Sequence, residues 1–253
     1  MPGSVELPEL YSEAYFTGGG PGYVGYLNDE ATHRTQARRY LARLAREGQL
    51  RGRLLDVGCA TGFFLDEARR AGWDVAGCEV SGYAAAHARN GLGLDVQCAP
   101  LLETSYPPAS FDVITFFNVL EHIPEPRAVA ERVHALLEPG GLLVIETWDR
   151  DSLAARAAGR RWHQYSPPFV VSYFNRRSLA CLFGPDRWHL ARYRPVPKWI
   201  TLRRGFSVLR DLGRPGKWAT LTNHFAHSRL GGISVPYVLG DLVWVVFTHG
   251  AEN

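Results

Sequence analysis

The sequence predicts an α/β protein in which a parallel sheet is covered by helices on both faces. Two observations lead to this fold class. From residue 53 onward, short apolar segments alternate with segments of helical character, and the apolar segments are almost continuous rather than alternating with polar residues. Parallel strands that are buried on both faces have this pattern. The length of 253 residues fits one large domain or one domain with insertions.

Two segments precede this alternating region. Residues Tyr11–Tyr26 are rich in glycine and aromatic side chains, which predicts a loop that either packs on the domain or covers a ligand. Residues Glu30–Glu47 carry apolar side chains at helical spacing and predict an amphipathic helix. Its apolar stripe contains Ala37, Tyr40, Leu41, Leu44 and Ala45.

Between residues 53 and 147 we expect five strands separated by helices, because β-type apolar runs alternate with periodic segments that end at glycine. The expected strands are Arg53–Val57, Trp73–Glu79, Leu94–Cys98, Phe111–Phe117 and Leu142–Thr147. The expected helices are Phe63–Ala71, Tyr83–Asn90 and Pro126–Leu137.

The alternation loosens after residue 150. Expected there are short helices over Asp151–Gly159 and Arg176–Phe183 and two final strands over Trp188–Arg194 and Leu242–Thr248. The connection Pro195–Gly240 includes a predicted helix over Trp218–Leu230. A connection of this length is usually functional or an insertion.

Charge is distributed unevenly along the chain. Residues 1–149 contain 12 basic and 20 acidic residues, a net charge of −8, whereas residues 150–253 contain 16 and 5, a net charge of +11. A positive field over one half favours an anionic partner, such as a phosphorylated or nucleotide-linked small molecule. The alternative is a solvated arginine-rich face.

Composition also narrows the setting in which the protein works. No apolar run approaches the ~18–20 residues of a membrane span, and the first 15 residues contain three glutamates and no basic residue, unlike a secretory signal. The four cysteines form no C-x-x-C and no zinc-type spacing with histidine, so we expect no metal site. We expect three of them to be buried on strands or turns and one to lie on a helix. Unpaired thiols favour a cytoplasmic protein.

The strongest local signal is Leu54-Leu55-Asp56-Val57-Gly58-Cys59-Ala60-Thr61-Gly62-Phe63, which predicts a strand, a turn between two glycines and a helix. Gly58 and Gly62 let the backbone approach a ligand without a Cβ clash, and the helix directs its free N–H groups toward it. The G-x-x-x-G spacing differs from the G-x-G-x-x-G that holds a dinucleotide pyrophosphate, which argues against a nicotinamide cofactor.

Polar residues follow two of the neighbouring strands. Glu79 ends the second predicted strand, where a carboxylate can accept both hydroxyls of a ribose; the alternative is a surface glutamate before a turn. The fourth strand ends at Asn118, and His122 follows it. Ligands of open α/β sheets bind outside these strand ends.

Together, Leu54–Gly62, Phe111–Ile114, Leu120–Pro124 and Leu137–Thr147 resemble class I S-adenosylmethionine-dependent methyltransferases, and most of all the subgroup of ubiquinone-type O-methyltransferases and methyltransferases of sugar and natural-product pathways. The resemblance covers roughly residues 50–150. It implies a Rossmann-like, doubly wound, mostly parallel seven-stranded sheet with an antiparallel last strand and an inserted cap-like segment. Three regions follow: an N-terminal arm and helix acting as a lid (1–50), a cofactor-binding core (51–150), and the rest of the sheet with acceptor-side insertions at 195–240 (151–253).

The resemblance also implies S-adenosylmethionine as cofactor. The methionine end would contact the Gly58–Gly62 turn, with Asp56 orienting the turn or the ammonium group, and Ala99–Leu101 would flank the adenine. The cofactor-binding residues expected in full are Asp56, Gly58, Cys59, Ala60, Gly62, Phe63, Glu79, Val80, Ala99, Pro100, Leu101, Asn118 and Leu120. The acidic pair common in the family after the third strand is missing, so we expect apolar and backbone contacts to the adenine.

The expected reaction is methyl transfer to a small molecule, with a hydroxyl on a sugar, quinone or natural-product intermediate as acceptor. A hydroxyl needs a base near its proton, and His122 is the candidate, because an imidazole titrates in the working pH range. The alternative is a structural histidine beside the cofactor. His163 and Tyr165 are weaker candidates.

Two other interpretations stay open at this level. An RNA methyltransferase could use basic positions of the 195–240 connection, although no RNA-binding module is recognisable; these positions are Arg203, Arg204, Arg210, Arg214 and Lys217. A non-catalytic relative could bind the cofactor as a structural or regulatory ligand, because a fold does not fix a function. Nothing in the sequence indicates the oligomeric state.

Overall fold

The computed structural model describes residues 10–17, 26–201, 234–237 and 239–250. The helix expected over Trp218–Leu230 and the basic positions between 203 and 217 lie outside the described residues.

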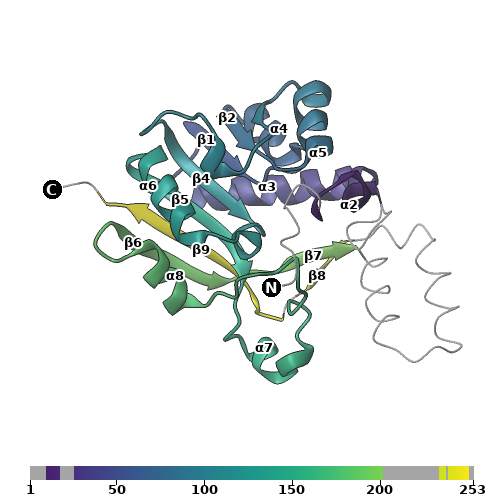
Figure 1. Cartoon of the computed structure of the whole chain (residues 1–253), viewed down its shortest axis with the longest axis vertical. Helices are drawn as coiled ribbons and strands as arrows, with labels where there is room; N and C mark the ends of the chain where they lie inside the picture. Colours follow the sequence, from purple (N-terminus) through teal and green to yellow (C-terminus); the bar gives the residue numbers. More distant parts are fainter. Residues whose placement is uncertain (1–9, 18–25, 202–233, 238, 251–253) are drawn as a thin grey trace, which may run out of the picture.

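A seven-stranded sheet forms the centre of the molecule, with strand order β3-β2-β1-β4-β5-β9-β6 (Figure 1). The strands are β1 (Arg53–Val57), β2 (Asp74–Cys78), β3 (Asp95–Gln97), β4 (Phe111–Phe117), β5 (Leu137–Trp148), β6 (Trp188–Pro195) and β9 (Leu242–His249). The first five pair in parallel, and β9 runs antiparallel to both β5 and β6. The prediction of a mostly parallel sheet with an antiparallel last strand is confirmed.

Helices cover both faces of this sheet (Figure 1). The helices of the described residues include α2 (Glu13–Thr17), α3 (Glu30–Arg46), α4 (Phe63–Arg70), α5 (Gly82–Ala86), α6 (Pro126–Leu136), α7 (Leu153–Ala158) and α8 (Arg176–Phe183), of which α2 and α7 lie beside the sheet rather than on it. Successive strand residues point to opposite faces, so Leu54 packs in the apolar cluster that includes Leu44 of α3, whereas Leu55 packs in the cluster that includes Val133 of α6.

An ion-pair network holds α3 against α4. Arg34 of α3 donates to Asp66 at 2.6 Å and to Glu67 at 3.0 Å, both on α4 and both nearly buried. Because α4 begins directly after the glycine turn that follows β1, this network fixes the position of α3 beside the carboxyl ends of the strands.

Three elements differ from the prediction in detail. Strand β5 begins at Leu137 instead of Leu142, because Leu137 pairs with Phe111 before the register shifts and Leu142 pairs with Val113. The helix expected over Tyr83–Asn90 is two elements, α5 and the π-helical turn η2 (His87–Gly91). The segment expected to be a loop over Tyr11–Tyr26 contains the short helix α2.

The long connection after β6 begins and ends in a two-stranded antiparallel ribbon that the sequence analysis missed. It consists of β7 (Lys198–Thr201) and β8 (Ser234–Tyr237), with Trp199 opposite Pro236. Each strand has only four residues, and the proline disguises β8, because proline cannot donate to a strand ladder.

The expectation for the cysteines is wrong for one of them. Cys59 and Cys78 are buried, but Cys98 is exposed directly after β3, as is Cys181 on α8. Within the described residues, no helix is long and apolar enough to cross a membrane.

Candidate active site

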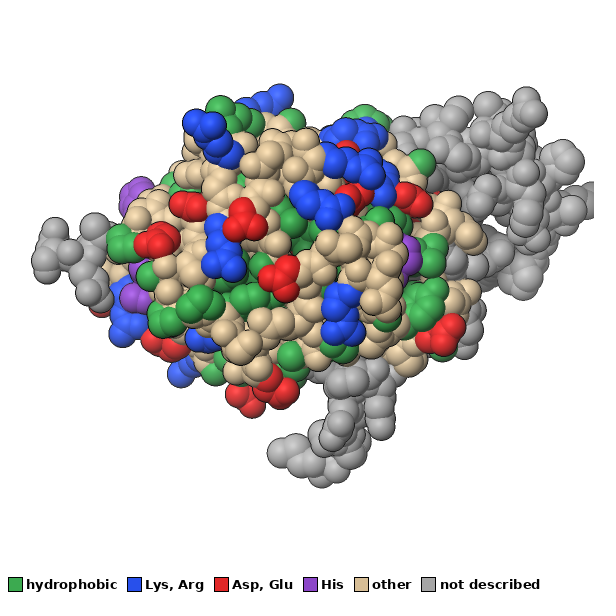
Figure 2. Space-filling view, turned by 90° about the horizontal axis from the view of Figure 1, so that it is seen from above, with side chains coloured by type: hydrophobic (Ala, Val, Ile, Leu, Met, Phe, Trp, Pro, Cys, Tyr) green, Lys and Arg blue, Asp and Glu red, His purple; other side chains and the backbone are tan. Residues whose placement is uncertain are grey.

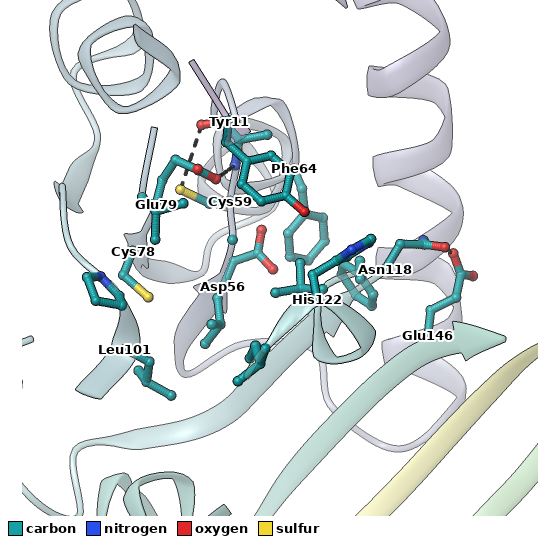
Figure 3. Close-up of a pocket in the computed structure, with 18 of the residues that line it drawn as sticks. Tyr11, Asp56, Cys59, Phe64, Cys78, Glu79, Leu101, Asn118, His122 and Glu146 are labelled. Carbon is teal, nitrogen blue, oxygen red and sulfur yellow. Dashed lines mark hydrogen bonds between the residues drawn. The ribbon is translucent and has the colours of Figure 1, made fainter. Parts of the chain in front are cut away.

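A cavity of about 520 Å³ opens at the carboxyl ends of β1, β2, β3, β4 and β5, beside α3 (Figure 3). Most of the residues expected at a cofactor site line it. They are Asp56, Gly58, Cys59, Ala60, Phe63, Glu79, Val80, Ala99, Pro100, Leu101, Asn118 and the candidate base His122. The structure therefore gathers residues from several strand ends into one site.

Two expected residues do not line the cavity. The side chain of Leu120 is fully buried in the apolar cluster on the α6 face. Gly62 faces away from the cavity toward η2, since a Cβ at this position would lie 2.9 Å from the Cβ of Ala88 and 2.6 Å from Leu94. Gly62 directly precedes α4 and has a positive φ of 85°, which glycine adopts without strain. The structure therefore shows Gly62 shaping the turn and packing against η2.

The turn after β1 is fastened to β2. Gly58 and Cys59 donate their backbone N–H groups to the carbonyl of Cys78, at 2.8 and 3.2 Å. Gly58 has a φ of +70°, and a Cβ there would lie 2.6 Å from a methyl carbon of Val119. Glycine is required here both by the backbone conformation and by the close approach of the loop that follows β4.

Glu79 is a buried carboxylate with its orientation fixed by two backbone donors. The N–H of Ala60 lies 2.9 Å from Oε2, and the N–H of Ser81 lies 2.9 Å from Oε1. Burial raises the pKa of Glu79, and these backbone hydrogen bonds oppose the rise. Each oxygen keeps a further lone pair, so the carboxylate can accept two more hydrogen bonds from a ligand in the cavity.

Asp56 lies between Glu79 and His122 in the cavity wall (Figure 3). The hydroxyl of Thr115 on the neighbouring strand donates to its Oδ1 at 2.6 Å. Burial raises the pKa of Asp56 to about 7, the bond from Thr115 opposes this, and the charge of Glu79 adds to it. A cationic ligand bound close to Asp56 would lower this pKa again and favour the ionised carboxylate.

A third buried acidic side chain, Glu146 at the end of β5, was missed by the sequence analysis. It accepts hydrogen bonds from the hydroxyl of Tyr40, from Arg43 at 3.1 Å and from the side-chain amide of Asn118 at 3.1 Å. Tyr40 also stacks on Phe117 with ring centroids 4.0 Å apart. This network joins α3 to the ends of β4 and β5. Glu146 at its centre is buried, with 1% of its surface exposed.

Asn118 has a positive φ of 57° at the end of β4. Its amide nitrogen is engaged by Glu146, whereas its Oδ1 is buried without a hydrogen-bond partner among the described residues. A buried acceptor without a partner costs ~1–3 kcal/mol. A ligand that brings an N–H or O–H donor to this wall removes that cost.

His122 is held in one orientation by the segment that precedes α8. Its Nδ1 lies 2.6 Å from the carbonyl oxygen of Phe169. A carbonyl only accepts, so Nδ1 carries the proton and Nε2 keeps its lone pair in the neutral ring. Glu121 fastens the same segment, because its carbonyl accepts from the N–H groups of Val171 and Ser172, both at 3.0 Å.

Aromatic residues of the N-terminal segment cover this side of the cavity. Tyr11 meets His122 edge to face with ring centroids 6.2 Å apart, and it contacts Phe169 in the same manner at 6.4 Å. Tyr15 and Phe16 also line the cavity. These residues lie where the predicted lid would be; whether the segment opens and closes stays a prediction.

The two weaker candidates for a base lie elsewhere: neither His163 nor Tyr165 lines the cavity, and Tyr165 is exposed. The described lining contains carboxylates but neither lysine nor arginine; the carboxylates are Asp29, Asp56, Glu79, Glu103, Glu125 and Glu146. Within the described residues, therefore, the basic half of the chain does not reach the cavity with an arginine.

Comparisons with known proteins identify the family of the chain. A family model described as a methyltransferase domain matches residues 30–184, more than half of the chain. A ubiquinone biosynthesis O-methyltransferase from Bradyrhizobium sp. is 36% identical over 167 residues, which are 55% of this chain and 66% of that protein. The enzyme of the same name from Bordetella bronchiseptica is 33% identical over 179 residues, covering 64% of this chain and 74% of that protein.

Coverage of the curated relatives is partial: the chain spans between 45% and 74% of the length of eight that it matches. Among solved structures, a SAM-dependent methyltransferase from Archaeoglobus fulgidus aligns with a TM-score of 0.61 at 15% identity, over 89% of this chain and 100% of that one. This likeness confirms the Rossmann-like methyltransferase fold. Because the family model covers most of the sheet and the whole glycine turn, the chain belongs to the methyltransferase domain family.

Proposed function

We propose that this protein transfers a methyl group from S-adenosylmethionine to a hydroxyl group of a small, ring-containing molecule, with His122 as the general base. The observation that carries the proposal is the geometry of His122. It shares one cavity with the glycine turn and Glu79, and its Nδ1 is held by Phe169 so that Nε2 is the available base.

The residues of the cavity fit S-adenosylmethionine. Two lone pairs of Glu79 match the two ribose hydroxyls, and the buried Oδ1 of Asn118 offers an acceptor to the ammonium group. Ala99, Pro100 and Leu101 provide an apolar surface for the adenine. The cofactor supplies a methyl group on a positively charged sulfur, so the protein has mainly to align the acceptor and to remove its proton.

The lining of the cavity favours an uncharged aromatic acceptor. Tyr11, Tyr15, Tyr40, Phe117 and Trp199 contribute ring surfaces, and the described lining offers no cationic side chain of lysine or arginine to an anion. The names of the curated relatives, which are O-methyltransferases of ubiquinone biosynthesis, support a hydroxyl acceptor. A phosphorylated or nucleotide-linked acceptor would meet no lysine or arginine in the described lining.

Within the described residues, no contact or surface feature favours RNA as the acceptor. On the face seen in Figure 2, basic side chains lie among acidic ones rather than forming a continuous basic surface. Several of the described arginines are paired with carboxylates, as Arg34 is with Asp66 and Arg192 with Glu47.

The proposal is tested with S-adenosylmethionine that carries a labelled methyl group. The purified chain is incubated with catechol, with methyl glucoside and with bulk RNA, and label in each product is counted. We expect transfer to catechol and none to RNA. Label in RNA alone would replace the proposed acceptor class, and binding of the cofactor without transfer to any acceptor would favour a non-catalytic relative.

Glu79→Ala is expected to weaken binding of S-adenosylhomocysteine by roughly 10- to 150-fold, the equivalent of about 1.5–3 kcal/mol for hydrogen bonds to a charged group. Isothermal titration calorimetry measures the change, with circular dichroism to show that the variant is folded. Glu131→Ala, which removes an exposed glutamate of α6, is the control and should bind as the wild type does. Unchanged affinity in Glu79→Ala would place the ribose elsewhere.

A further inference from the structure

Trp199 comes from a different part of the sequence than every other residue of the described cavity wall. All the others lie between Tyr11 and Glu146, whereas Trp199 belongs to β7, in the long connection between β6 and β9. An element inserted after the core of the sheet therefore contributes a side chain to the site.

The topology places Trp199 away from the adenosine end of the cavity. Glu79 and Ala99–Leu101 follow β2 and β3, at one end of the sheet, whereas β6, which leads into β7, is the strand at the opposite end. Figure 1 shows the β7–β8 ribbon running from that side toward α2. Val196, which lies between β6 and β7 in the sequence, packs in the same buried cluster as Tyr40 and Trp244. Trp199 thus approaches the cavity from the side of Glu146.

Arg39 of α3 holds the indole ring. Its guanidinium carbon lies 3.7 Å from the centroid of the Trp199 ring, within the range of a strong cation–π contact. Burial, together with the nearby charge of Arg43, lowers the pKa of Arg39. Arg39 forms no ion pair within the described parts of the chain, and the ring of Trp199 is its cation–π partner there.

We propose that Trp199 is a specificity-determining residue, which contacts the acceptor and limits the size of the ring that fits beside His122. The inference rests on the proposed function. It follows from an aromatic side chain that contacts Arg39 of α3 and lies at the end of the cavity opposite to the ribose carboxylate, Glu79. A flat apolar wall at this place selects flat, apolar acceptors and excludes larger ones by contact.

The experiment compares two acceptors that differ by one fused ring, catechol and 2,3-dihydroxynaphthalene, in the full chain. For each protein, kcat/KM is measured for both acceptors, and the Kd of S-adenosylhomocysteine is measured by calorimetry. In Trp199→Ala we expect kcat/KM for the naphthalene diol to rise at least about tenfold relative to that for catechol, on the scale of pocket-size discrimination, with the Kd unchanged within about threefold.

Trp199→Phe should give an intermediate ratio, because a smaller ring remains in the wall; this variant also serves if the alanine variant does not fold. Arg39→Gln keeps the indole of Trp199 but removes the cation that contacts it. The ratio of kcat/KM for the two diols should therefore change less in this variant than in Trp199→Ala. Leu153→Ala changes an exposed residue of α7 outside the cavity and is the control, with the wild-type ratio.

A selectivity ratio that is equal in the wild type, Trp199→Ala and Trp199→Phe would overturn the assignment while leaving the proposed function intact. A raised Kd for S-adenosylhomocysteine with an unchanged ratio would move Trp199 to the cofactor subsite and overturn it as well. Wild-type protein that methylates neither diol would refute the aromatic acceptor itself, and the role of Trp199 would fall with it.

Discussion

His122→Ala is expected to lower kcat by about 10²–10⁴-fold, the range in which general-base catalysis contributes. The Kd of S-adenosylmethionine should stay within about threefold of the wild-type value, because a base acts in the transition state whereas a cofactor ligand acts in the ground state. Steady-state kinetics with catechol and calorimetry with the cofactor measure the two quantities separately.

A second substitution at the same position separates a base from a structural residue. His122→Asn keeps an N–H donor close to the position of Nδ1, and so can preserve the bond to the carbonyl of Phe169, but it has no Nε2. If His122 is the base, both variants lose kcat equally. Recovery of activity in His122→Asn would show that the bond to Phe169 is what matters. His163→Ala, outside the cavity, is the control and should keep the wild-type rate.

The strand ends of the first four strands were predictable from the sequence for a physical reason. In a parallel sheet covered on both faces, each strand is an uninterrupted apolar run, so its end coincides with the first polar or glycine residue. That rule located Gly58, Glu79 and Asn118, all of which line the cavity. Leu120 was placed there by the resemblance to the methyltransferase family, but the 3₁₀ turn η4 (Leu120–His122) directs its side chain into the core.

The network around Glu146 was not predictable in the same way. Glu146 bonds to Tyr40, which is 106 residues earlier in the sequence, and to Arg43 on the same helix. Tyr40 was correctly assigned to the apolar stripe of that helix, yet periodicity reports only which face is buried. A signal was present: Glu146 interrupts an apolar strand, and a buried carboxylate requires partners.

The contribution of chain segments far from the core motifs also escaped the sequence analysis. The ribbon that carries Trp199 consists of two strands that the long connection separates. Each strand has four residues, which are too few for an alternating pattern to be recognised. Its pairing depends on contacts across that connection, which no local pattern encodes. The length of the connection was the usable signal, since it indicated a functional insertion.

Asp56→Asn is expected to remove a pH dependence from the stability of the ligand-free protein. The pKa of Asp56 is raised from 3.8 to about 7 by burial, so the folded state keeps a proton that the unfolded state releases above about pH 4. The stabilisation from this group is therefore fully present below about pH 4 and is lost as the pH rises to about 7. At most ~1.4 kcal/mol is lost per pH unit, and on the order of 4 kcal/mol in all.

The side-chain amide introduced by Asp56→Asn mimics the protonated acid, because it can still accept from Thr115 and cannot ionise. Urea unfolding between about pH 4 and pH 8 should give a free energy of unfolding that falls with pH more steeply in the wild type than in Asp56→Asn. Burial also raises the pKa of Glu79, and Asp56→Asn keeps that carboxyl group, so the difference between the two curves reports Asp56 together with its coupling to Glu79. Asp95→Asn, at an exposed position on β3, should follow the wild-type curve. Parallel curves for the wild type and Asp56→Asn would mean that water reaches Asp56 in the ligand-free protein, and that it is already ionised before a cationic cofactor binds.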